Sequence, residues 1–102
     1  MSTLLITIGR LRTDGAEALE RYAAGVIPVI TAQGGQVVSR GIPRETVVGD
    51  DKGRPDLVAV IRFPTAEAIR RFLSSPEYRA NLPHSDRAFA EVHSYIAADL
   101  ME

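Results

Sequence analysis

The stretch LVAVIRFPTAEA, residues 57–68, decides the fold of this chain. Its first seven residues, Leu57–Phe63, are almost all apolar and include three β-branched side chains, which is typical of a central strand. Pro64 and Thr65 follow, and Thr65 is a suitable N-cap for a helix. The apolar face of that helix would consist of Ala66, Ile69, Phe72 and Leu73. A strand followed at once by an amphipathic helix indicates a sheet covered by helices.

Upstream of this stretch the chain predicts a strand and a long helix. Residues 3–11 are rich in leucine and isoleucine over a short span, as strands are. A helix starts near residues 13–15, and its apolar face recurs at the helical period: Leu19, Tyr22, Ala23, Val26 and Ile30. Gly25 and Pro28 interrupt it, so we expect a kink or two short helices before the glycines at 34 and 35.

A second strand is predicted for Gln36–Ile42. Plain alternation there places Val37 with Ser39 on one face, and it places Arg40 on the other. Residues 45–49 are a candidate continuation of this strand. Residues 49–56 are dense in glycine, proline and aspartate, which indicates a loop.

The end of the chain predicts short helices and a last strand. Residues 75–77, Ser-Pro-Glu, favour a new helical turn, because serine caps and proline suits the first helical position. Pro83 is expected to end that turn, a last helical stretch to cover residues 85–90, and a terminal strand residues 92–100. The order β-α-β-β-α-β is the split βαβ pattern of α+β, ferredoxin-like folds with a four-stranded antiparallel sheet. A chain of 102 residues fits one domain, residues 1–102.

Both faces of the predicted sheet are apolar, which favours a homodimer. The helices of such a fold cover one face only, yet the alternate positions of the first strand carry Leu4, Ile6 and Ile8. Monomers rarely expose an apolar patch above a few hundred Å². Pairing two sheets face to face would cover it, and two-fold dimers are the commonest oligomers.

Composition excludes several classes of protein. The chain is 45% hydrophobic and 25% charged, with a net charge of −1, which argues against disorder and against a nucleic-acid partner. Cysteine is absent, so disulfides, thiolate catalysis and cysteine–zinc sites are ruled out. We see no signal peptide and no run near the roughly 20 apolar residues of a membrane helix, and we expect a cytoplasmic protein without a membrane partner. Glycine motifs for nucleotides and the GxSxG elbow are also missing, and no cofactor is expected.

A set of motifs occurs in a specific order along the chain. These are Gly34-Gly35, Arg40-Gly41, Gly49-Asp50, the strand-Phe-Pro-Thr sequence of residues 57–65, Ser75-Pro76-Glu77-Tyr78-Arg79 and Arg87. Together they resemble the domain-of-unknown-function family thirteen-thirty, within the dimeric α/β-barrel superfamily, over nearly the whole chain.

The resemblance implies a ferredoxin-like protomer whose sheet packs against that of a second copy and encloses a small cavity. It implies no activity, because the family is uncharacterised. Proteins of the same fold include cofactor-independent monooxygenases, lactone isomerases, haem-degrading enzymes and ligand-sensing domains, and fold alone does not choose among them. The absence of tryptophan removes a residue characteristic of the haem-degrading group.

Two arginines are candidate ligand-binding residues. Arg40 lies on the second strand beside Gly41, and its planar guanidinium suits a carboxylate or enolate. An ion pair with Glu45 or an intersubunit carboxylate is the simpler explanation for it. Arg87 matches the recurring arginine of the family. It would share an anion with Arg40, or else tie the helix end to an acid such as Glu91.

Two histidines and a tyrosine complete the candidates. His84 and Asp86 form a His-x-Asp pair in a predicted loop, where the histidine is a candidate base or a solvated side chain. His93, on the terminal strand, is a candidate acid/base or a packing residue. Tyr78 is either a core-packing residue whose hydroxyl reaches a partner or, because it lies near the Ser75-Pro76 break, a residue at a pocket mouth. No cluster of three or four ligands indicates a metal site.

We therefore predict a small dimeric protein that binds a small anionic or enolisable metabolite in its barrel cavity. A cofactor-independent monooxygenase or isomerase is the enzyme class that this picture suggests, and the sequence leaves open whether any reaction is catalysed. The rival prediction is a non-catalytic interaction or assembly protein whose dimer is the functional unit.

Overall fold

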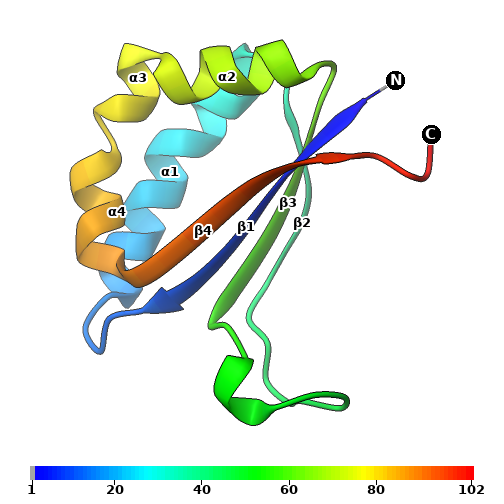
Figure 1. The fold of residues 1–102 in the computed structure, drawn as a ribbon. Helices are drawn as coiled ribbons and strands as arrows, with labels where there is room; N and C mark the ends of the chain where they lie inside the picture. Colours follow the sequence, from blue (N-terminus) through cyan, green and yellow to red (C-terminus); the bar gives the residue numbers. More distant parts are fainter. Residues whose placement is uncertain (1) are drawn as a thin grey trace.

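Four strands form one antiparallel sheet, and helices α1 to α4 cover one of its two faces (Figure 1). The computed structural model describes residues 2–102. The strands are β1 (Thr3–Leu11), β2 (Gln36–Gly41), β3 (Leu57–Phe63) and β4 (Phe89–Ala98). The helices are α1 (Ala16–Ala32), the short 3-10 helix η1 (Asp51–Gly53), α2 (Ala66–Ser74), α3 (Pro76–Arg79) and α4 (Leu82–Ala88).

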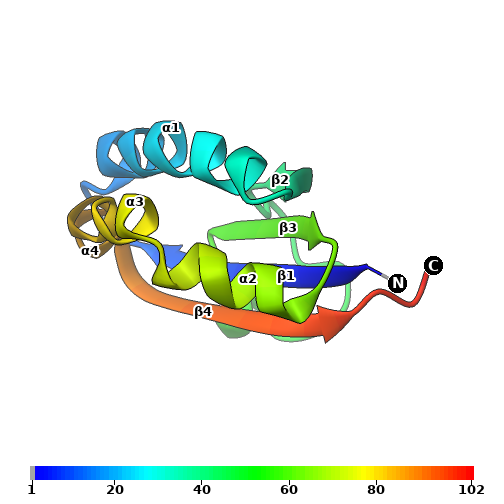
Figure 2. The same cartoon turned by 90° about the horizontal axis from the view of Figure 1, so that it is seen from above.

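The strand order is β2-β3-β1-β4, so that β3 and β1 lie in the centre of the sheet. This order, with helical connections after β1 and β3, is the ferredoxin-like α+β arrangement predicted from the sequence. Figure 2 shows α1 lying beside the run of α2, α3 and α4 above the strands. Strands β1 and β3 each begin and end at the residues predicted from the sequence.

The two faces of the sheet differ in burial. On β3, Leu57, Ala59, Ile61 and Phe63 are buried, while the residues between them are half-buried. The buried side is the helix face. It packs against Val26 and Ile30 of α1 and against Ile69 and Phe72 of α2. The opposite side is the free face, which carries Leu4, Ile6 and Ile8 of β1, Val58 and Val60 of β3, and Tyr95 of β4.

Helix α1 is continuous through Pro28, so of the two predicted alternatives, a kink or two short helices, the second is wrong. Proline removes the hydrogen bond to the carbonyl of Ala24 four residues earlier. Both Ala24 and Pro28 are exposed, and water can therefore take the place of the missing donor. The missing hydrogen bond costs little free energy because it lies on the exposed side of α1, opposite the apolar face of the helix.

Strand β2 departs from the predicted alternation. Its register against β3 shifts between Val37 and Ser39, which leaves Val38 as the extra residue of a β-bulge. Val37 pairs with Ile61 and Arg40 pairs with Ala59, so both lie on the helix face. The predicted placement of Val37 and Arg40 on opposite faces is wrong for this reason. The strand also ends at Gly41, and residues 45–49 do not continue it.

Caps define the short helices that follow β3. Thr65 caps α2 as predicted, its Oγ1 accepting a hydrogen bond from the amide of Ala68 at 3.0 Å. Pro83 lies in the first turn of α4 and starts that helix, because proline fits where the amide has no partner. The predicted break at Pro83 is therefore wrong, and His84 lies on a helix instead of in a loop. Strand β4 also begins earlier than predicted, at Phe89.

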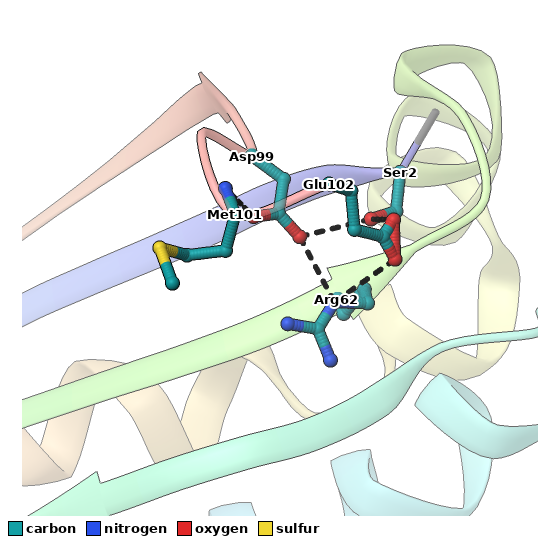
Figure 3. Close-up of polar contacts among 5 residues, drawn as sticks. All are labelled: Ser2, Arg62, Asp99, Met101 and Glu102. Carbon is teal, nitrogen blue, oxygen red and sulfur yellow. Dashed lines mark hydrogen bonds and ion pairs between the residues drawn. The ribbon is translucent and has the colours of Figure 1, made fainter.

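The two ends of the described chain are joined by polar contacts that we call the terminal clasp: Ser2, Arg62 and Asp99 (Figure 3). The Asp99 carboxylate accepts hydrogen bonds from Ser2 Oγ at 2.9 Å and from Arg62 Nε at 3.0 Å. The amide of Met101 donates to the same carboxylate at 3.0 Å. These contacts fix the chain after β4 to the end of β3.

Candidate functional site

A cavity of about 70 Å³ lies between the helices and the helix face of the sheet. Its roof comes from α1, α2 and α3, and its floor comes from all four strands. A volume of this size holds a few water-sized groups, which corresponds to a small metabolite and not to a drug-sized ligand. We call it the helix–sheet cavity.

One row of residues across the sheet makes room for this cavity, because three of its four side chains are small. Arg40, Ala59, Thr7 and Ser94 are paired one after another across β2, β3, β1 and β4. The next row on the same face is larger, with Val37, Ile61, Leu5 and Ile96. Because alanine, threonine and serine fill less space than those residues, the floor is lowest along their row. The Thr7 and Ser94 hydroxyls are hydrogen-bonded to each other at 2.9 Å.

Arg40 is the one charged residue among the described residues that line the cavity. The bulge at Val38 brings it to the helix face, and bulges often direct a side chain in this way beside functional sites. Within residues 2–102 its guanidinium takes part in none of the ion pairs. The expected ion pair with Glu45 is not formed. An exposed cation at the edge of an apolar cavity is thus available to an anionic group.

Two tyrosines line the same cavity. Tyr22 comes from α1, where its ring packs edge-on against Phe89 with centroids 6.2 Å apart. Tyr78 comes from α3, with its ring 4.8 Å from that of Phe72. Burial raises the pKa of Tyr22 well above the ordinary phenol range, and the neighbouring Tyr78 hydroxyl adds to the rise. The Tyr22 hydroxyl is therefore neutral at physiological pH.

Ser75 fixes the position of Tyr78. This buried serine is the N-cap of α3, and its Oγ accepts a hydrogen bond from the Tyr78 amide at 3.2 Å. The same Oγ donates to the carbonyl of Phe72 at 2.8 Å. One hydroxyl thus joins the end of α2 to the start of α3 and sets the direction in which Tyr78 leaves the backbone.

His84 and Arg87 lie together in a different place, which we call the α1–α4 hollow. This open depression of about 410 Å³ lies between the start of α1 and α4. Arg12, Arg21 and Arg87 face Asp14, Glu17 and Asp86 there, so the two signs of charge are balanced. Arg21 pairs with Glu17 at 2.7 Å, and Arg12 Nε donates to the carbonyl of Asp86 at 2.9 Å. Arg40 and Arg87 therefore line separate depressions of the protomer.

His93 lies on the free face, away from the helix–sheet cavity. Its Nε2 is 2.7 Å from Glu91 Oε1, and Arg10 Nε is 3.8 Å from the other oxygen of that carboxylate. The hydrogen bond to His93 is the largest influence that lowers the pKa of Glu91, and the charges of His93 and Arg10 act in the same direction. Tyr95 lies on the same face of β4.

The structure thus brings Arg40 and Tyr78 together and places His84, Arg87 and His93 elsewhere. Sequence reasoning assigned Tyr22 to core packing and did not consider Thr7 or Ser94. The sequence carries a signal for Thr7 and Ser94. Each is a hydroxyl residue at an inward position of its strand, and the neighbouring inward residues are apolar. Among residues 2–102 we find neither a group of three metal-ligating side chains nor a helix long and apolar enough to span a membrane.

The arrangement of sheet, helices and cavity defines the class first: an α+β protein of the ferredoxin-like fold. A dimeric protein of unknown function from Bacteroides fragilis, described as ferredoxin-like, superposes with a TM-score of 0.69 at 8% identity, over 96% of this chain and 96% of that one. More specifically, the chain belongs to the family "Domain of unknown function (DUF1330)", which matches residues 6–98. The resemblance seen in the sequence is confirmed.

Two further structures illustrate the range of similar proteins. A protein of unknown function from Rhodopseudomonas palustris is 25% identical, covers 97% of this chain and 82% of its own, and gives a TM-score of 0.86. A NIPSNAP family protein of unknown function from Agrobacterium tumefaciens is 17% identical over 93% of this chain and 85% of its own, with a TM-score of 0.66. Among curated proteins none matches.

Proposed function

We propose that this protein is a homodimer that binds a small anionic or enolisable metabolite in the helix–sheet cavity of each protomer. Arg40 holds the anionic group, and the apolar walls exclude water from the rest of the ligand. The observation that carries the proposal is the unpaired Arg40 guanidinium at an otherwise uncharged cavity. A cation facing low-polarity surroundings attracts an anion more strongly than one in bulk water does.

The cavity supports binding more directly than catalysis. Neither His84 nor His93 lines it, so no histidine is placed to move a proton of a ligand bound there. The tyrosines are the titratable groups nearest to such a ligand, and the raised pKa of Tyr22 suits a hydrogen-bond donor, not a base. Oxygenation of an enolisable ligand in this cavity would have to use dissolved oxygen as its electron acceptor. Isomerisation would have to exchange its proton with solvent.

The test of binding compares matched acids and amides by isothermal titration calorimetry. Propanoate, hexanoate and benzoate are titrated against the wild-type protein beside their amides, which have the same shape without the charge. We expect at least one carboxylate to bind about ten- to a hundredfold more tightly than its amide, as a charged hydrogen bond does. Arg40→Gln should remove this preference.

Arg44→Gln is the matched control, since Arg44 is near in sequence but does not line the cavity. It should keep the preference of the wild type. If Arg40→Gln also kept it, or if no carboxylate bound better than its amide, the proposed function would be wrong. A dimer that persisted without binding any acid would favour an assembly protein instead.

The free face supports the dimer. Leu4, Ile6 and Ile8 lie next to Val58 and Val60 there, and within residues 2–102 the helices α1 to α4 all lie on the opposite face (Figure 1). The structure from Bacteroides fragilis that shares the fold is described as dimeric, and a second copy is the partner that covers such a face symmetrically.

Light scattering after size exclusion tests the dimer. Ile6→Glu puts a charge in the middle of the free face and should shift the mass from two chains to one, because a buried unpaired carboxylate is costly. Ala24→Glu, on the exposed side of α1, is the control and should stay with the wild type. A monomeric wild type, or a dimer unaffected by Ile6→Glu, would count against this interface.

A further inference from the structure

The helix–sheet cavity has polar groups at two separate places. Arg40 lies on β2, at one edge of the sheet. The Tyr22 and Tyr78 hydroxyls belong to helices α1 and α3 in the roof. Most of the lining between them is aliphatic or aromatic carbon, such as Val26, Ile61 and Phe72. A ligand that fills the cavity therefore meets a cation and a pair of tyrosines.

The tyrosine pair has an unused donor. Two hydroxyls in contact can satisfy one of their two protons by bonding to each other, and the other proton remains. The hydrogen bonds of Tyr78 to Ser75 and Asn81 use its backbone amide and its carbonyl, not its hydroxyl. An oxygen of the ligand that accepts this remaining proton would gain one hydrogen bond.

The floor of the cavity extends from Arg40 across the two neighbouring strands. Arg40 and Thr7 are two strands apart, or about 10 Å between backbones. The arginine side chain covers part of that distance, which leaves room for a short carbon chain or one ring. Ala59 lies between them and adds only a methyl group to the floor.

We infer that the ligand is a small oxo acid: a carboxylate held by Arg40, an apolar middle, and a carbonyl oxygen that accepts a hydrogen bond from the Tyr22–Tyr78 pair. This inference rests on the proposed function, because it takes the Arg40 site as the place of the anion. It adds the second anchor and thereby the class of ligand. Such an acid is enolisable at the carbon beside its carbonyl, and neutral phenols stabilise the enolate oxygen by the same hydrogen bond.

The experiment compares hexanoate with 4-oxohexanoate and 5-oxohexanoate by calorimetry on the full chain. The carboxylate is the same in all three, and only the presence and the place of the ketone change. We expect at least one oxo acid to bind about three- to tenfold more tightly than hexanoate, the ratio that one neutral hydrogen bond gives. Tyr22→Phe and Tyr78→Phe keep the rings and should reduce this ratio to about one.

Tyr95→Phe is the matched control, because this tyrosine is 54% exposed on the free face. It should keep the preference for the oxo acid. Hexanoate binding that depends on Arg40, without any preference for a ketone, would overturn the two-anchor inference and leave the proposed function standing. Failure of all three acids to bind would overturn both.

Discussion

Gly15 is a residue at which the packing of two helices depends on a single missing side chain. It precedes α1 and faces the end of α4, where a Cβ atom would lie 2.3 Å from the carbonyl oxygen of Ala88. That oxygen already accepts the amide of Arg12 at 2.8 Å, and a backbone atom cannot rotate away as a side chain can. The hydrogen bond and the helix contact therefore hold the position of Ala88.

We expect Gly15→Ala to lower the free energy of unfolding by about 1–3 kcal/mol, the usual cost of overpacking. Gly53→Ala is the control, since a Cβ atom at Gly53 would meet nothing within 4 Å. Urea denaturation of the two variants and the wild type measures the difference. Equal stability of the two variants would contradict the close approach of α1 to α4.

At the scale of the residue, the sequence predicts the features that follow from the alternation of apolar and polar side chains. It selected Arg40 and Tyr78 for their chemistry, and both line the cavity. It placed Arg40 on the wrong face of β2, because a bulge at Val38 leaves no mark in the pattern of apolar and polar residues. It could not separate Arg87 from Arg40, because the distance between their positions depends on how α4 packs.

At the scale of the element, the turn between α2 and α3 connects the fold to the site. Thr65 and Ser75 both cap a helix, with Thr65 at the start of α2 and Ser75 at the start of α3. Replacing either by alanine should cost about 1 kcal/mol of unfolding free energy. Only Ser75 also sets the backbone of Tyr78, so only Ser75→Ala should weaken the preference for an oxo acid over hexanoate.

Urea denaturation and calorimetry on the two variants check this pair of expectations. Loss of the preference in Thr65→Ala as well would mean that general loosening, and not the cap of α3, is responsible. The sequence predicted both caps, since serine or threonine before a helical stretch is a local signal. It did not predict the continuous α1 or the start of α4, because the exposure of Pro28 and the place of Pro83 depend on tertiary packing.

At the scale of the whole molecule, the terminal clasp holds the two ends of the described chain against β3 (Figure 3). The Asp99 side chain is 2% exposed, and its carboxylate is satisfied only while it is ionised. The Met101 amide makes the largest contribution to lowering the pKa of Asp99, followed by Arg62 and Ser2. The topology and the uncovered apolar face followed from the sequence, but this clasp did not, because Asp99 lies beyond any regular pattern.

The clasp predicts acid sensitivity of the fold. A carboxyl group whose pKa is lower in the folded chain than in the unfolded one adds stability in full above its unfolded pKa, about 3.9 for aspartate. That contribution is lost as the pH falls through the folded pKa. Urea denaturation between pH 7 and pH 3 should therefore show wild type more stable than Asp99→Asn at pH 7, with the gap narrowing below about pH 4. Glu17→Gln is the control, since Glu17 pairs with Arg21 on the exposed surface of α1, where an ion pair adds little stability and we expect a smaller gap. A gap between wild type and Asp99→Asn that stayed constant down to pH 3 would mean that the charge of Asp99 does not hold the ends of the chain.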